Sequence, residues 1–197
     1  MNGSDEQNPA ATRVDIALVH YPVINKNGER IGAAITNLDL HDIARAAKTF
    51  GVTNLYVVTP FQDQQDLYQE ILEHWLKGHG ARYNAKRGQA LSLVHMCNDL
   101  AELYDLAETQ WQQRPFVIAT GARPQGGILP YEQVREKIGE GSSILILFGT
   151  AWGLAPEVME QVDGILPPIC GPGEYNHLSV RSAAAIVLDR LLGKRDE

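Results

Sequence analysis

The sequence has 197 residues, of which 44% are hydrophobic and 21% charged, and its formal net charge is −7. This composition is ordinary for one globular domain with a substantial core, and it excludes a fibrous or disordered chain. The negative charge argues against a globally basic surface for nucleic acid but leaves room for a local basic patch. The apolar runs are far shorter than the roughly 20 residues that cross a bilayer, and the first residues lack a basic and apolar leader. We therefore expect a soluble, cytoplasmic protein that makes no contact with membranes.

The cysteines and histidines form no cluster along the sequence. Cys97 and Cys170 stand far apart, no CxxC pair occurs, and the six histidines are scattered. Disulfide frameworks need paired cysteines, and structural zinc sites need closely spaced ligands. We therefore expect neither a disulfide nor a metal site.

Predicted strands and helices alternate along most of the chain. Residues 1–13 are polar and predict a flexible tail, whereas residues 14–197 predict a single domain. Asn25-Lys-Asn-Gly28 predicts a turn, because Asn-Gly favours left-handed backbone. Continuous apolar runs predict strands at residues 14–19, 54–59, 115–120, 143–148 and 163–167. Helical spacing of apolar residues predicts a first helix capped by Asn37 or Asp39 and ended by Gly51, and later helices at residues 66–77, 91–107 and 131–138, from Pro156 onward, and at residues 180–192.

The pattern of these elements indicates an α/β fold. Strands that are apolar along their whole length are buried on both faces, which is typical of a parallel sheet covered by helices on both sides. In open parallel sheets, ligands bind beyond the carboxyl ends of the strands. The loops that follow the later strands are therefore the first place to look for a site.

Three of those loops combine glycine or proline with little side-chain bulk. They are Thr120-Gly-Ala-Arg, Gly149-Thr-Ala-Trp-Gly and Pro167-Pro-Ile-Cys-Gly-Pro-Gly. Glycine allows close approach of the backbone to a ligand, and exposed amides and carbonyls suit a purine edge or a ribose. The P-loop, GxGxxG and GxSxG motifs do not occur after the corresponding strands. These residues alone predict a nucleotide-like ligand of unspecified identity.

A basic segment lies in the middle of the sequence. It contains Lys77, Arg82, Lys86 and Arg87 within eleven residues. Two interpretations stay open, a solvated loop and a surface that docks RNA phosphates.

Several segments, taken in order, resemble the motifs of SPOUT-superfamily RNA methyltransferases. Residues 43–52, with Arg45 before an Ala…Phe-Gly-Val run, resemble the first motif. Residues 116–121 resemble the strand that enters the knot, and residues 147–154 resemble the second motif. Pro168 and Ile169 resemble the pair before the third motif, and residues 176–188 resemble that motif and its closing helix. The nearest resemblance is to a bacterial branch of S-adenosylmethionine-dependent RNA methyltransferases.

The resemblance implies a C-terminal trefoil knot that holds S-adenosylmethionine, a homodimer, and tRNA or rRNA as substrate. A non-catalytic module of the same fold that binds the cofactor or RNA is the alternative. Carried over by position, Arg45 lies near the acceptor, although a solvated helix position is its other interpretation. Arg181 and Asp39 depart from the family pattern and are further catalytic candidates, Arg181 to bind an anion and Asp39 as a base. Helix capping is the other interpretation of Asp39. The family glutamate of the second motif is replaced at about Ala151, which leaves the methylated atom open. The implied cofactor contacts are Thr120, Gly121, Gly149, Thr150, Gly153, Pro168, Ile169, Leu178 and Val180.

Overall fold

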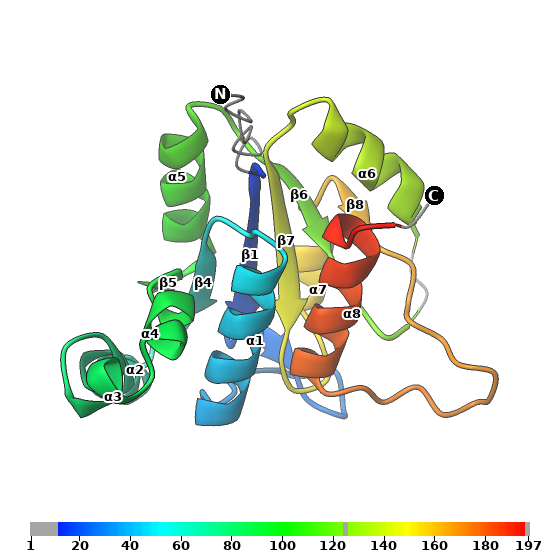
Figure 1. Cartoon of the computed structure of the whole chain (residues 1–197). Coiled ribbons are helices and arrows are strands. Elements are labelled where there is room, and N and C mark those ends of the chain that lie inside the picture. Colours follow the sequence, from blue (N-terminus) through cyan, green and yellow to red (C-terminus); the bar gives the residue numbers. More distant parts are fainter. Residues whose placement is uncertain (1–11, 124–125, 196–197) are drawn as a thin grey trace, which may run out of the picture.

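A six-stranded sheet forms the centre of the molecule. The computed structural model describes residues 12–123 and 126–195, so most of the predicted tail at residues 1–13 lies outside the described residues. The strand order is β5-β4-β1-β7-β6-β8 and every pairing between these strands is parallel, as the apolar runs predict (Figure 1). The strands are β1 (Val14–Val19), β4 (Leu55–Val58), β5 (Val94–Cys97), β6 (Phe116–Ala119), β7 (Ile144–Gly149) and β8 (Gly164–Ile165).

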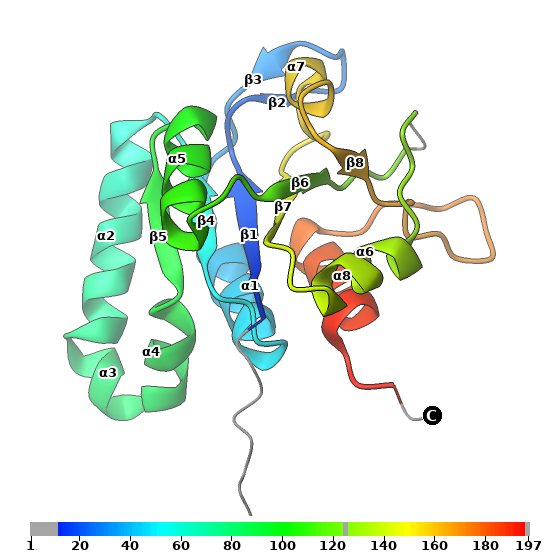
Figure 2. The same ribbon diagram turned by 90° about the horizontal axis from the view of Figure 1, so that it is seen from above.

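Helices cover both faces of the sheet. Successive residues of β1 point to opposite sides, so Ile16 and Leu18 join one core cluster while Ala17 and Val19 join the other. The first cluster includes residues of α1, α4, α6 and α8, and the second includes residues of α5 and α7. Figure 2 shows α1 and α8 on one side of the sheet and α7 on the other. The helices are α1 (Asn37–Thr49), α2 (Gln62–Leu76), α3 (His79–Tyr83), α4 (Ala85–Leu91), α5 (Leu100–Trp111), α6 (Tyr131–Gly139), α7 (Pro156–Met159) and α8 (Val180–Leu192).

The predicted turn at Asn25–Gly28 closes a small hairpin. Its strands are β2 (Val23–Ile24) and β3 (Arg30–Ile31), which pair in antiparallel fashion. The amide of Gly28 donates to the Asn25 carbonyl at 3.0 Å, and Gly28 has a φ of 81°, which glycine adopts without strain. The hairpin contacts the chain after β7 through bonds between Ile24 and the segment at Trp152–Gly153.

The single helix predicted over residues 91–107 is wrong. The chain instead ends α4 at Leu91, forms strand β5 beside β4, and starts α5 at Leu100. Val94 and Cys97 are buried in the strand and His95 is exposed, and this short stretch fits helical spacing as well as strand spacing. Parallel pairing with β4 makes this stretch a strand rather than part of a helix. Helix α5 then starts after Asp99, whose side chain caps it by accepting from the Glu102 amide at 2.9 Å.

Two helix starts also differ from prediction. Thr36, not Asn37 or Asp39, caps α1, because its hydroxyl accepts from the Asp39 amide at 3.1 Å. Helix α2 begins at Gln62, four residues before the predicted start at Asp66.

The start of β1 is held against α5 by one side chain. Arg13 donates to the Trp111 carbonyl at 2.9 Å.

The described part of the chain contains no helix that is both long and apolar enough to span a bilayer. Within residues 12–123 and 126–195, no group of three or more His, Cys, Asp or Glu side chains could hold a metal ion.

Candidate cofactor and RNA site

The three small-residue loops leave neighbouring strand ends. Strand β6 lies between β7 and β8, and the three strands run parallel. The loops that follow them therefore lie side by side at the end of the sheet where the strands have their carboxyl ends, and this end is the edge meant below. Both the amide and the hydroxyl of Thr120 donate to the Leu147 carbonyl at 3.0 Å. The Leu166 amide donates to the Ala119 carbonyl at 2.9 Å, which fixes the exit of β8 against β6. The geometry thus brings Thr120 and Gly121 next to the segments that contain Gly149 and Pro168.

The turn from Gly149 to Gly153 is held on several sides. The buried Thr150 hydroxyl donates to the Val19 carbonyl at 3.0 Å, and the Gly153 amide donates to the Thr150 carbonyl at 3.0 Å. Ala151 and Gly153 have φ angles of 51° and 113°, which lie in the left-handed region. A Cβ on Gly149 would stand 2.6 Å from the Leu154 backbone nitrogen, so this position has no room for a larger residue. The turn is therefore tight, well ordered by hydrogen bonds, and made largely of backbone.

The third loop runs from β8 to α8 and extends away from the sheet before it returns (Figure 1). Ile169 and Val180 pack partly against the core, whereas Leu178 is 46% exposed. The Asn176 side-chain amide donates to the Ala122 carbonyl at 2.8 Å, which links this loop to the one after β6. Ser179 caps α8 by accepting from the Ser182 amide at 3.3 Å. The nine residues carried over as cofactor contacts therefore lie on connected segments at one edge of the sheet.

Two of the three loops fit S-adenosylmethionine, whose sulfonium carries a positive charge. No lysine or arginine occurs at residues 149–153 or 164–173, so these two segments do not repel a cation. Glycine and proline leave backbone amides and carbonyls as the polar groups, and these can recognise an adenine edge and a ribose.

Arg181 and Asp39 form an ion pair beside this edge. The Arg181 Nη1 donates to Asp39 Oδ1 at 3.0 Å, and the Thr36 hydroxyl donates to Asp39 Oδ2 at 2.6 Å. Asp39 is nearly buried, and Arg181 directly follows Val180 at the start of α8. Because both carboxylate oxygens already accept hydrogen bonds, Asp39 is poorly placed to take a proton from a substrate and well placed to orient Arg181.

Arg45 lies on the exposed side of α1 and borders two hollows. One, of about 410 Å³, lies between α1 and α8 and is also lined by Asp42 and Arg181. Arg45 Nη1 stands 3.7 Å from Asp42 Oδ1, with most of its side chain in solvent. The guanidinium is thus free to reorient toward an anionic ligand.

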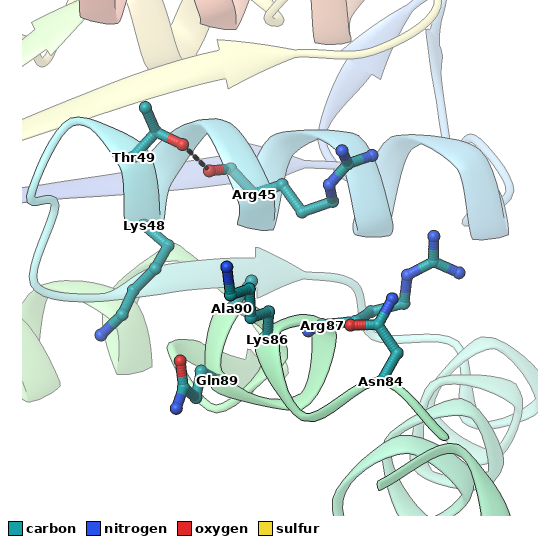
Figure 3. Close-up of a pocket in the computed structure, with 8 residues that line it drawn as sticks. All are labelled: Arg45, Lys48, Thr49, Asn84, Lys86, Arg87, Gln89 and Ala90. Carbon is teal, nitrogen blue, oxygen red and sulfur yellow. Dashed lines mark hydrogen bonds between the residues drawn. The ribbon is translucent and has the colours of Figure 1, made fainter. Parts of the chain in front are cut away.

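The second hollow, of about 440 Å³, is a basic groove between α1 and α4. Figure 3 shows side chains of the two helices facing one another, with Arg45 and Lys48 on α1 and Lys86 and Arg87 on α4. The Arg87 guanidinium also lies 4.7 Å from the centre of the Trp75 ring, which holds it in place. The predicted basic segment is therefore not a loop but the end of α2 together with α3 and α4. Lys77 and Arg82 are exposed but do not line the groove.

His20 is a further polar residue near this edge that the sequence patterns did not identify. It directly follows β1, its side chain is fully buried, and neither ring nitrogen has a hydrogen-bond partner among the described residues. Burial lowers the pKa of His20 to about 4, against the smaller opposing effects of the Asp39 charge and the Ala33 backbone. A polar residue at the carboxyl end of the central strand was the available sequence signal.

A parallel sheet of this order, covered by helices on both faces, places the chain in the α/β class, in which ligands bind beyond the carboxyl ends of the strands. The family described as SAM-dependent RNA methyltransferase matches residues 13–193. The chain belongs to this family, which confirms the resemblance and identifies S-adenosylmethionine as the cofactor.

Relatives and solved structures agree with this assignment. A "tRNA (guanine-N(1)-)-methyltransferase" of Oleidesulfovibrio alaskensis is 49% identical over 177 residues, which cover 90% of this chain but 41% of that protein. The chain therefore spans about two fifths of that relative's length. An uncharacterised protein of Aquifex aeolicus is 38% identical, with 92% of this chain and 89% of that protein covered. The crystal structure of TrmJ from Z. mobilis shares the fold, with a TM-score of 0.60, 20% identity, and coverage of 93% of this chain and 70% of that one. The expected SPOUT-like sheet and helices are thereby confirmed.

Proposed function

We propose that the chain transfers a methyl group from S-adenosylmethionine to RNA. The observation that carries this proposal is the convergence, at one edge of the sheet, of three backbone-lined loops and the Arg181–Asp39 pair, in a chain of the matched family. When bound, the cofactor supplies an activated methyl group. The protein's task is then to align the acceptor with that methyl and to stabilise charge on the acceptor. The proposed cofactor contacts are Thr120, Gly121, Gly149, Thr150, Gly153, Pro168, Ile169, Leu178 and Val180.

The charged residues take different roles in this proposal. Arg181, oriented by Asp39, faces the hollow that Arg45 also lines, so the two guanidinium groups can bind one phosphate or stabilise one developing anion. The ion pair favours orientation of Arg181 over proton transfer as the role of Asp39. The general base then comes from another group or from solvent.

The substrate is proposed to be tRNA. The support is the name of the relative from Oleidesulfovibrio alaskensis, although this chain covers less than half of that protein, so the guanine N1 position does not carry over with the name. The fold also fits the non-catalytic alternative, a module that holds the cofactor or RNA without methyl transfer. We further propose a C-terminal trefoil knot, a homodimer packed near the cofactor site, and a cytoplasmic location, as the family resemblance implies.

Methyl transfer is tested with tritiated S-adenosylmethionine and separate pools of bulk tRNA and rRNA. We expect label in tRNA with the wild-type protein. An Arg45→Ala variant should retain cofactor affinity but incorporate at least about tenfold less label, because an exposed arginine that binds an anion contributes to transition-state charge stabilisation. Cofactor binding without label in either RNA pool would favour the non-catalytic module. Equal labelling by the variant would remove Arg45 from the mechanism.

The basic groove is proposed to bind the phosphate backbone of the RNA. Lys48 and Lys86 enter it from α1 and α4 and raise the local positive charge of an otherwise acidic protein. We expect Lys86→Ala to weaken RNA binding and to reduce the slope of log K against log salt by about one, since one phosphate contact is lost. Lys194→Ala is the matched control, because Lys194 is exposed just beyond the end of α8. Identical slopes for Lys86→Ala and wild type would place the RNA elsewhere.

A further inference from the structure

Three rings gather on the outer side of the cofactor loops. Trp152, in the turn after β7, packs edge-on against His177, with ring centres 6.2 Å apart. His177 in turn contacts Tyr175 at 5.8 Å between ring centres. These rings come from two loops that are distant in sequence, so the fold itself assembles the cluster.

The backbone under Trp152 is fixed although the ring is exposed. The Trp152 amide donates to the Ile24 carbonyl at 3.1 Å, and the Ile24 amide donates to the Gly153 carbonyl at 3.0 Å. Hydrogen bonds of Thr150 to the Val19 carbonyl hold the other side of the turn. The turn therefore presents the indole from a rigid base, and little conformational entropy is lost when a partner binds it.

Core packing does not account for these side chains. Trp152 is 52% exposed and Tyr175 is 81% exposed, although tryptophan and tyrosine gain stability from burial. Leu178, also on the third loop, adds further exposed apolar surface. An exposed aromatic cluster, with Trp152 on a backbone fixed by hydrogen bonds, is typical of a surface that binds a ligand or partner.

The chemistry of the cluster selects an unpaired nucleobase. Every base has a π-face, and stacking on aromatic side chains is the usual way in which proteins hold single-stranded RNA. An enzyme that modifies a base must also take that base out of its stack, which requires a surface to receive it. The cluster stands on the same loops as the proposed cofactor contacts, so a base stacked there lies close to the methyl donor.

We propose that Trp152, His177 and Tyr175 form a stacking platform for an unpaired base of the RNA substrate, at or next to the methylated nucleotide. This inference rests on the proposed RNA methyltransferase function and deepens it, because it specifies a looped or single-stranded target. The basic groove between α1 and α4 binds phosphates without regard to pairing, whereas the platform discriminates paired from unpaired bases.

The test measures binding of a fluorescently labelled short single-stranded RNA and of the same RNA annealed to its complement. Wild type should prefer the single strand. Trp152→Ala should bind the single strand about tenfold more weakly, whereas Trp152→Phe, which keeps a ring, should lose much less. Tyr175→Ala should weaken binding in the same direction, and Leu106→Ala, an exposed apolar residue on α5, should leave it unchanged. Affinity for S-adenosylmethionine, measured by calorimetry, should be unaltered in all of these variants.

Intrinsic fluorescence gives a second readout. Trp152 is the exposed tryptophan of the three in the sequence, so stacking with a base should quench the emission of wild type. The quenching should be absent in Trp152→Phe.

Three results would overturn the platform. Unchanged single-strand affinity in Trp152→Ala would exclude stacking, and loss of cofactor affinity alone would make the indole a cover for S-adenosylmethionine. A change of oligomeric state by light scattering would assign the rings to an interface between copies of the chain. Failure of the proposed function is distinguishable, because the wild-type protein would then bind no cofactor or methylate no RNA.

Discussion

A Gly149→Ala variant is expected to bind S-adenosylmethionine at least about tenfold more weakly than wild type. The added Cβ would stand 2.6 Å from the Leu154 nitrogen and 2.9 Å from the Gly153 carbonyl carbon, and both are backbone atoms that cannot rotate away. Relief requires a shift of the turn from Gly149 to Gly153, at a cost of about 1–3 kcal/mol. A ligand that contacts the backbone of this turn loses a comparable part of its binding free energy.

Calorimetry with S-adenosylmethionine and with its demethylated product provides the measurement. Gly139→Ala is the matched control, since a Cβ there meets no atom within 4 Å and Gly139 ends α6. Thermal unfolding of both variants separates a local shift from general destabilisation. Wild-type cofactor affinity in a folded Gly149→Ala protein would show that the ligand does not touch this turn, and would remove Gly149, Thr150 and Gly153 from the proposed site.

The sequence predicted the central strands of the sheet better than the outermost strand on one side, β5. Strands β1 and β7 are buried along nearly their whole length, so their apolar runs are unambiguous. Strand β5 has a neighbour on one side only, is buried only at its two ends, and is stabilised by pairing with β4, which no local pattern reveals. The N-terminal cap of α1 was also ambiguous in the sequence. Thr36, Asn37 and Asp39 can all cap a helix, and only the path of the backbone in the fold determines that Thr36 does so.

The candidate site was predictable in its loops but not in its pairings. Glycine and proline after apolar strands indicated the three loops that the structure brings together beyond β6, β7 and β8. The contact between Arg181 and Asp39 joins residues 142 positions apart, and the basic groove joins Arg45 to Lys86 across two helices. Trp152 was part of a recognised loop, but its exposure and its contact with His177 depend on the fold. Such long-range contacts follow from topology, so they become visible only in three dimensions.

Replacement of His20 by leucine is expected to make the protein markedly more resistant to acid. The folded-state pKa of about 4 lies below the ordinary value of 6.5 because the ring is buried. As the pH falls from about 6.5 to about 4, the unfolded chain takes up a proton on His20 that the folded protein does not, so wild type progressively loses stability. The shift of about 2.5 pH units corresponds to about 3 kcal/mol, or a decrease in Tm of roughly 10 °C for a chain of this size.

The measurement is the difference between the stability curves of His20→Leu and wild type from pH 8 to pH 4. Leucine is similar in size and needs no hydrogen bond, so the variant should be at least as stable as wild type near pH 8. The advantage should then grow as the pH falls. Asp15, whose pKa burial raises to about 6, has the opposite effect, because its protonation makes the folded state more stable as the pH falls. Both proteins carry Asp15, so this effect cancels in the difference between the two curves. Parallel curves would mean that the His20 ring titrates as it does in the unfolded chain. In that case the buried imidazole must have a hydrogen-bond partner, such as an internal water, that stabilises its charged form.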